Sequence, residues 1–209
     1  MNTPTESPKV SHDDRPSVSK AGRRRFLGTG SVAAPVILTM FSQPALGVTC
    51  FTPSRSLSRN TSVSQAGKNG ECTGAQSPGN YSAQTNPGRP AYSWPIPPDT
   101  PFHPTFVAGR PGAVFYKMVN NQLVSMTMLE VLNLGGNQDP EKMAFHLIGA
   151  YLNCLGGGGS RISPLAITAE GVLRIWSEWA TKGYYEVTAG VQWSATEIKA
   201  YLLDNGIVG

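Results

Sequence analysis

The chain has 209 residues and a formal net charge of +4, from 17 Lys and Arg against 13 Asp and Glu. Residues 1–47 hold six of the basic residues and three of the acidic ones, so the 162 residues that follow carry a charge of about +1. A nucleic-acid-binding surface needs clustered Lys and Arg, and this near neutrality argues against nucleic acid as a partner. A length of 162 residues suits a single domain.

The N-terminal region has the pattern of a cleaved export signal. Arg23 and Arg24 are followed by Phe26 and Leu27, and then by a mildly apolar run over residues 29–46. A membrane-spanning helix needs about 20 predominantly apolar residues, whereas Gly, Ser and Pro interrupt this run, so a cleaved signal fits better than an anchor. The arginine pair with Phe-Leu resembles the twin-arginine (Tat) export signal. That resemblance implies that the Tat machinery delivers the folded chain to the periplasm, the cell surface or the medium, and that the membrane is met only during export.

The most suitable cleavage site follows Gly47, because Ala45 and Gly47 place small residues at the −3 and −1 positions. The alternative is a lipoprotein with Cys50 as the lipidated first residue, although Thr49 before it makes a poor recognition sequence. The prediction is a signal peptide over 1–47, an irregular segment over 48–112 and a helical domain over 113–209.

The three cysteines all follow the predicted cleavage site, where an oxidising compartment allows disulfides. Cys50 and Cys72 bracket a segment that is poor in helix and strand formers, and we favour this pair. Cys154 then remains as a free thiol at the end of an apolar helix, where it would behave as a small buried hydrophobe.

Residues 48–112 are rich in Ser, Thr, Asn, Gly and Pro and show no apolar periodicity, which predicts an extended strap. The prolines over 87–101 cannot sustain a helix. Four aromatic residues lie in or near this run: Tyr92, Trp94, Phe102 and Phe106. The strap either packs on the helical domain of the same chain or forms an exposed recognition segment.

Residues 112–134 are ambiguous, because their apolar residues fit a helical stripe while part of the run alternates as in a strand. We favour a helix, which Asn120-Asn121 divides into two pieces, followed by a short turn over 127–133.

Three amphipathic helices are predicted after this segment. The first begins near Asp139 and Pro140 and ends at the glycines 156–159, the second covers 168–182, and the third starts with a capping box at Ser194. Residues 184–188 form a short strand or a turn. The fold class is therefore mainly α, with three to five helices, the strap, and at most one short β-hairpin or strand.

No catalytic, cofactor or metal constellation emerges from the sequence. The glycines 156–159 lack the Gly-Lys-Ser/Thr of a phosphate loop. His146 and Cys154 are eight residues apart on one helix, about 12 Å of rise, which is too far for a nucleophile and base pair. His103 and His146 are the only histidines after the signal, so a three-histidine metal site is impossible. We expect no cofactor, and an enzymatic role is less favoured than a non-enzymatic one.

Several segments resemble motifs of exported bacterial surface proteins: a Leu-rich turn over 129–136, an Ala-Leu-Leu-Asn-Ala-like helix over 144–153, a Pro-Leu segment over 164–172, and a degraded Cys-Thr-Pro-Gly opening over 72–81. The resemblance implies export and supplies no catalytic residues. The leading hypothesis is an exported interaction or structural protein whose partner is a larger subunit or a cell-surface component. The alternative is an accessory small subunit of a Tat-exported oxidoreductase.

Overall fold

A computed structural model describes residues 48–58, 70–83, 92–139 and 141–209. The predicted export signal (Arg23, Arg24, Phe26, Leu27), the cleavage residues Ala45 and Gly47, part of the proline-rich run and Pro140 lie outside the described residues. Among the described helices, none has the length and apolarity that a membrane span requires.

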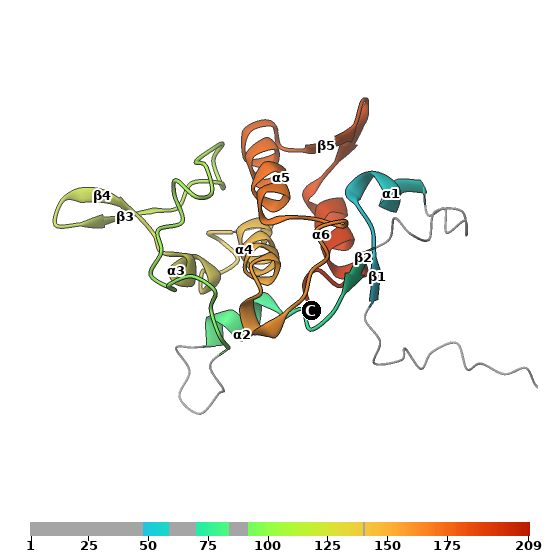
Figure 1. Ribbon diagram of the computed structural model, residues 1–209. Coiled ribbons are helices and arrows are strands. Elements are labelled where there is room, and N and C mark those ends of the chain that lie inside the picture. Colours follow the sequence, from blue (N-terminus) through green and yellow to red (C-terminus); the bar gives the residue numbers. More distant parts are fainter. Residues whose placement is uncertain (1–47, 59–69, 84–91, 140) are drawn as a thin grey trace, which may run out of the picture. The chain divides into compact units, whose positions relative to one another are not determined.

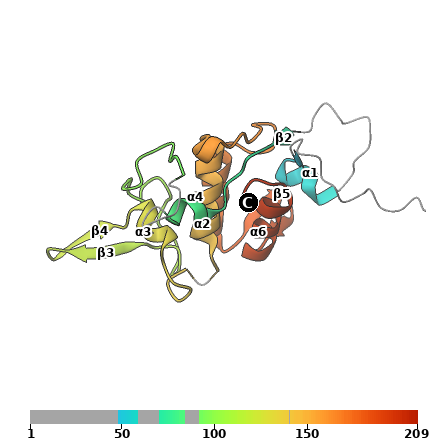
Figure 2. The ribbon, with the colours of Figure 1, turned by 90° about the horizontal axis from the view of Figure 1, so that it is seen from below.

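Two helices form the centre of the structure. α4 (Met143–Cys154) and α5 (Ala169–Lys182) pack against each other in both ribbon views (Figures 1 and 2). α6 (Ala195–Asp204) packs on α4, as do the short helices α2 (Pro78–Ser82) and α3 (Met128–Leu132). The 3₁₀ turn η3 (Gly157–Gly159) ends α4, and α1 (Pro53–Ser58) lies near the strand β5 (Tyr185–Thr188).

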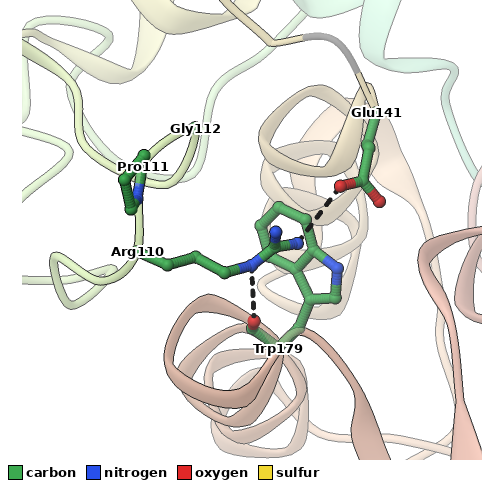
Figure 3. A pocket seen from close by; sticks show the side chains of 5 residues that line it. All are labelled: Arg110, Pro111, Gly112, Glu141 and Trp179. Atoms are coloured by element: carbon green, nitrogen blue, oxygen red, sulfur yellow. Dashed lines mark hydrogen bonds and ion pairs between the residues drawn. The ribbon is translucent and has the colours of Figure 1, made fainter.

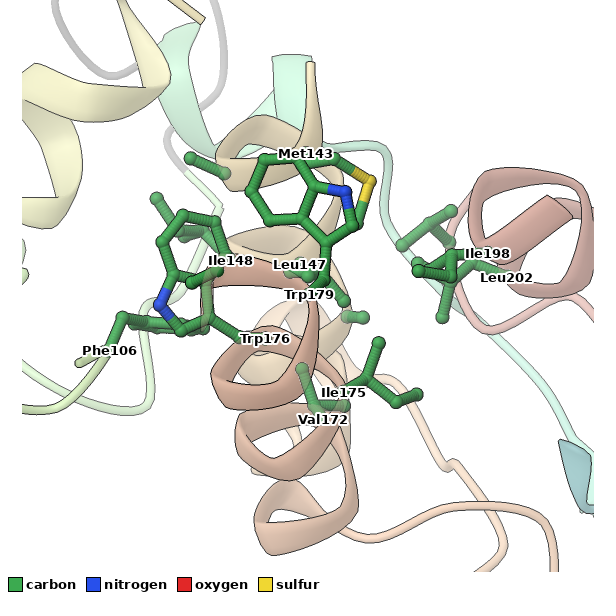
Figure 4. Close-up of a cluster of buried hydrophobic side chains, with 14 of the residues drawn as sticks. Phe106, Met143, Leu147, Ile148, Val172, Ile175, Trp176, Trp179, Ile198 and Leu202 are labelled. Atoms are coloured by element: carbon green, nitrogen blue, oxygen red, sulfur yellow. The ribbon is translucent and has the colours of Figure 1, made fainter. Parts of the chain in front are cut away.

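The core fills the space between these helices (Figure 4). α5 contributes Trp176 and Trp179, which are at most 2% exposed, and their rings lie 5.3 Å apart. α4 contributes Leu147 and Ile148, and α6 contributes Ile198, all of them fully buried. Burying each such side chain is worth about 1.5–3 kcal/mol. Both tryptophans lie on the buried face of the helix that the sequence predicts over 168–182.

The helix ends follow local chemistry that the sequence reveals. The Thr168 side chain accepts a hydrogen bond from the Gly171 N–H at the start of α5, and Gly183 ends that helix in the left-handed region at φ 87°. Ser194 and Glu197 form the predicted capping box of α6. Side-chain caps satisfy backbone groups that the first or last turn of a helix leaves unpaired.

The start of α4 differs from the prediction, because the helix begins at Met143 rather than at Asp139. Lys142 has a φ of 55°, which breaks the helical geometry one residue before Met143. Asp139 is buried and still acts on the helix, since its Oδ2 accepts a hydrogen bond from the Phe145 N–H at 3.0 Å.

The predicted fold class, mainly α, was wrong, and the structure is mixed α/β. The described residues contain six α-helices and three separate two-stranded antiparallel pairs. β1 (Val48–Cys50) pairs with β2 (Gly70–Cys72), β3 (Tyr116–Val119) with β4 (Gln122–Ser125), and β5 with β6 (Val191–Trp193). At most one short hairpin or strand was expected.

The β3–β4 hairpin stands where a helix was favoured. Asn120 and Asn121 both have positive φ, 49° and 60°, and form the two-residue connection between Val119 and Gln122. Asparagine tolerates the left-handed region better than other non-glycine residues, and a two-residue loop with both φ positive matches the twist of a hairpin. The backbone conformation of Asn120 and Asn121 therefore explains why residues 116–125 form two strands and not a helix.

The strap is more ordered than predicted, because β1, α1, β2 and α2 lie within it. It packs on the core of its own chain, the first of the two expected arrangements: Phe102 and Phe106 are fully buried, and Trp94 is partly buried. The Trp176 Nε1–H donates to the Val107 carbonyl at 2.7 Å. A Cβ on Gly109 would lie 2.2 Å from the Ala180 carbonyl oxygen, so only glycine allows this close approach to α5.

Asn153 joins the strap, α4 and the C-terminal segment. Its side chain is fully buried, and its Oδ1 accepts from the Gln76 N–H at 3.1 Å and the Tyr81 hydroxyl at 2.7 Å. Its Nδ2 donates to the carbonyls of Gln76 and Ile207, each at 2.9 Å. All four hydrogen-bonding positions of the amide are therefore used.

Cys50 and Cys72 form the predicted disulfide across β1 and β2, with Cα atoms 5.9 Å apart. Both residues are buried beside Ala166 in a small cluster separate from the main core. Cys154 is free and half-buried, as expected. The disulfide uses the Cys50 thiol, so the alternative in which Cys50 carries a lipid is incompatible with this structure.

We expect Asn153→Leu to lower the free energy of unfolding by roughly 3 kcal/mol or more, because it leaves buried partners at Gln76, Tyr81 and Ile207 unsatisfied. Urea unfolding followed by tryptophan fluorescence measures this loss. Asn133→Leu is the matched control, since Asn133 is exposed and makes one side-chain hydrogen bond, to the Leu129 carbonyl. Equal losses in the two variants would contradict the central role of Asn153.

Replacing both Cys50 and Cys72 by Ala is expected to cost about 3 kcal/mol, since the disulfide closes a loop with a sequence separation of 22 residues. The reduced wild-type chain should unfold at the same urea concentration as this double variant. Cys154→Ala serves as the control, and it should keep the sensitivity of the chain to reductant. An unfolding midpoint of the wild-type chain that does not change on reduction would argue against a stabilising disulfide.

Candidate docking surface

A small pocket beside α5 is closed by its own side chains (Figure 3). The Arg110 guanidinium lies 4.4 Å from the ring centroid of Trp179, and its Nη2 donates to Glu141 Oε1 at 3.1 Å. Its Nε donates to the Trp179 carbonyl at 3.4 Å. The space left is about 40 Å³, whereas small-molecule sites span about 300–1,000 Å³. These contacts attach the strap to α5 and to the residues just before α4, and the remaining space is too small for a substrate.

His103, the first of the two histidines considered as candidates, has a structural position. Its ring is buried, its Nδ1–H donates to the Phe106 carbonyl, and its Nε2 accepts from the Phe115 N–H at 3.1 Å. Burial lowers its pKa, with the Phe106 hydrogen bond acting in the opposite direction. A neutral imidazole with both nitrogens occupied joins the strap to the residue just before β3.

His146 and Cys154 are not brought together by the fold, since both lie on α4 at the predicted spacing. The His146 Nδ1 is buried, and burial together with Lys199 and Lys142 lowers the pKa of this ring. Burial raises the pKa of the Cys154 thiol to about 12, which keeps it protonated and unreactive. Within the described ranges, no three His, Cys, Asp or Glu side chains are grouped as metal ligands would be.

The β3–β4 hairpin is the main apolar surface that the described residues expose. In both ribbon views it extends away from α4 and α5 (Figures 1 and 2). Met118 and Leu123 face each other across the two strands and are 64% and 65% exposed. Four more apolar side chains of the hairpin and the residue pair before it are also exposed: Val114, Tyr116, Val119 and Val124.

Both faces of the hairpin carry apolar side chains, because successive residues of a strand point to opposite sides. Tyr116, Met118 and Leu123 lie on one face, and Val119 and Val124 on the other. A sheet with one solvated face normally alternates apolar and polar residues. This hairpin alternates only in part, because its second face mixes Val119 and Val124 with Lys117 and Gln122. Apolar side chains therefore meet water on both faces.

The hairpin is firmly held at its base. The Met126 N–H donates to the Phe115 carbonyl at 3.0 Å, and the Phe102 N–H donates to the Met126 carbonyl at 2.8 Å. The Ser125 hydroxyl accepts from the His103 N–H at 2.8 Å. The position of the hairpin is therefore set by the core, although its tip makes few contacts.

The charge of the hairpin is also neutralised. Lys117, the charged residue of these two strands, pairs with Glu130 of α3. This carboxylate completes the α3 capping box with Thr127, and the pKa of Glu130 is lowered chiefly by the hydrogen bond from Lys117. Charged residues, prolines or bulges usually prevent an exposed strand edge from pairing with another chain. In this hairpin the charge is Lys117, and its ion pair with Glu130 weakens that protection.

A groove with about 480 Å³ of space adjoins the base of β3. Apolar side chains and two amides contribute to its walls: Val114, Phe115, Tyr116, Leu134, Asn137 and Gln138. The groove contains no charged lining residue. Each strand of the hairpin has one hydrogen-bonded neighbour strand in the described structure, so each also has an unpaired edge.

No family model, curated protein or solved structure matches this chain. The role of the hairpin therefore has to be inferred from its own chemistry. The sequence analysis did not identify this surface, since it assigned the same residues to a helix. The signal that could have found it is Asn120-Asn121 between two alternating segments, a typical hairpin pattern.

Acidification is expected to destabilise the fold through His103, which is buried, and His146, which is half-buried. Burial lowers both pKa values below the ordinary 6.5, so the unfolded chain takes up protons at a higher pH than the folded chain. Stability should be constant above about pH 7.5 and should fall below pH 6.5, by at most about 1.4 kcal/mol per pH unit for each histidine. Urea unfolding between about pH 8 and pH 5.5 measures this dependence.

The double variant His103→Gln and His146→Gln is the comparison for this experiment. It should be less stable at pH 7.5 and should show a weaker dependence on pH across the same interval. Asp139, whose pKa is raised chiefly by burial, acts in the opposite direction. An equally steep fall in the double variant would show that other groups cause the effect.

Proposed function

We propose that this chain is an exported, non-enzymatic interaction module that docks on another polypeptide through the β3–β4 hairpin. The observation that carries the proposal is the exposure of apolar side chains on both faces of a hairpin whose base is fixed by hydrogen bonds. Large exposed apolar patches mark interaction sites in soluble proteins. An unpaired strand edge adds the backbone hydrogen-bonding groups that β-strand addition uses.

Two features support the exported location. The residues Arg23, Arg24, Phe26 and Leu27 have the twin-arginine pattern, and the Cys50–Cys72 disulfide suits an oxidising compartment. The proposal places the mature N-terminus after Gly47, with Ala45 at the −3 position. The mass of the exported chain, measured by intact-protein mass spectrometry, tests this cleavage site directly.

The second candidate is an accessory small subunit of a Tat-exported oxidoreductase. It is favoured by the twin-arginine pattern, because that route carries folded and often cofactor-loaded cargo together with partner subunits. The hairpin would then be the surface that meets the large subunit. Co-purification of a flavin or haem enzyme in a fixed ratio from the native membrane supports this candidate, and a chain recovered without such an enzyme counts against it.

Site-specific photo-cross-linking in living cells tests the docking role. Met118 and Leu123 are each replaced by the photoreactive p-benzoylphenylalanine in the full-length chain. We expect a discrete covalent adduct with a polypeptide after irradiation from both positions. Leu165 is the matched control, because it is 55% exposed and lies outside the hairpin. The absence of adducts from both hairpin positions, or an equal yield from Leu165, would overturn the proposed function.

A further inference from the structure

We propose that the polypeptide bound by the hairpin is a second copy of this chain, and that the two β3 edges pair antiparallel about a two-fold axis to form a four-stranded sheet. This inference rests on the proposed function, since it names the partner of the same surface. Three properties of the described structure point to a second copy: the exposed area, the charge, and the position of the groove.

The exposed area is large for a surface that faces water. The six apolar side chains of the hairpin region together expose on the order of 500 Å², toward the upper end for the largest patch on a monomer. A stable interface buries about 800 Å² on each partner. The exposed side chains of the hairpin supply more than half of that area, and the groove residues that are not among them add to it. An isologous pair uses the same surface on both copies.

The charge of the surface also permits self-association. The Lys117 ammonium is neutralised by Glu130 of the same copy, and the groove beside β3 has no charged lining residue. Like charges directly opposite each other destabilise a strand pair. Two copies of this surface can therefore approach each other without a repulsion that would reject an identical partner.

The position of the groove selects the β3 edge. Strap residues already pair with the chain that continues from β4, through the bridge between Pro101 and Thr127. Most of the groove walls near the hairpin come from the β3 side, at Val114, Phe115 and Tyr116, although Met126, the residue after β4, also lines it. In an antiparallel pair, the tip of each hairpin lies beside the base of the other. Each tip would therefore meet the groove of the opposite copy.

The register follows from the alternation of faces. In an antiparallel pair, directly opposite residues point to the same side of the sheet. A two-fold axis perpendicular to the sheet also keeps a residue and its copy on the same side. The axis must therefore lie between one β3 residue and the same residue of the second copy. An axis at Lys117 would set two ammonium groups opposite each other. An axis at Met118 sets Met118 opposite the partner's Met118 and Lys117 opposite the partner's Val119. It also places the partner's Asn120-Asn121 turn near Tyr116, where the amides of Asn137 and Gln138 line the groove.

Sedimentation velocity of the full-length chain, over a wide range of concentrations, tests the dimer. We expect a monomer–dimer equilibrium in which Met118→Lys, at the two-fold axis, raises the dissociation constant at least about tenfold. Leu123→Lys lies on the outer strand β4, beside Met118, and should raise it by less. Leu165→Lys is the control and should leave the constant unchanged. Thermal unfolding of each variant shows that the loss of dimer is not a loss of fold, because both hairpin side chains are largely exposed.

A cysteine at the predicted axis tests the register. Met118→Cys should form a disulfide-linked dimer under mild oxidation, because the two Cα atoms would lie within the roughly 7 Å that a disulfide requires. Lys117→Cys, one residue away, should form it much less efficiently. Equal cross-linking of the two variants would overturn the proposed register, and a dimer that is insensitive to both lysine substitutions would overturn the proposed interface.

The outcomes separate this inference from the proposed function. A chain that is monomeric at every concentration, while its hairpin positions still photo-cross-link to a different protein, overturns the second copy and leaves the docking role in place. A monomeric chain without any hairpin adduct overturns both. A photo-adduct of twice the mass of the exported chain supports both.

Discussion

The buried amide of Asn153 is the interaction on which the rest of the fold depends. A buried polar group costs free energy unless it is hydrogen-bonded, and this amide finds its partners in two distant segments, at Gln76 and Tyr81 and at Ile207. The Asn153 carbonyl also accepts from the Ser160 hydroxyl at 2.7 Å. Because each partner must meet a defined position on α4, the amide fixes how the strap and the C-terminal segment lie against the central helices. Apolar contacts alone would allow these segments to shift.

Further contacts fix the described part of the strap between Asn153 and the base of the hairpin. The Trp94 Nε1–H donates to the Tyr81 carbonyl at 3.3 Å, which continues the strap over the core. Phe102 then stacks on Phe106 at 4.7 Å and meets Trp176 edge-on at 5.2 Å. His103 connects this turn to the hairpin, because its ring nitrogens bind the Phe106 carbonyl and the N–H of Phe115, the residue just before β3. The hairpin is therefore fixed at its base while its tip stays exposed, and a preorganised surface loses less entropy on binding than a mobile one.

The parts of the fold that local chemistry determines could be predicted from the sequence. The ends of α5 and α6 were identified from Thr168, Gly183 and Ser194, since caps depend on neighbours within a few residues. The hairpin could not be settled in the same way, because its apolar residues fit both a helix and a strand and only the backbone geometry of Asn120-Asn121 decides. The candidate surface was missed for the same reason. The hydrogen bonds of Asn153 could not be predicted, since its partners at Gln76 and Tyr81 lie more than 70 residues away in the chain.

The contacts of Phe51, the residue after β1, bear on when folding can finish. The Phe51 N–H donates to Asn205 Oδ1, and the Tyr201 hydroxyl donates to the Phe51 carbonyl, both at 2.9 Å. These bonds connect residues 150 or more positions apart, so the segment at Phe51 cannot dock until α6 and Asn205 after it have been synthesised. Contacts of such long range form late, because closing the intervening chain costs entropy first. The segment at Phe51 therefore docks on a chain whose C-terminal helix is already in place.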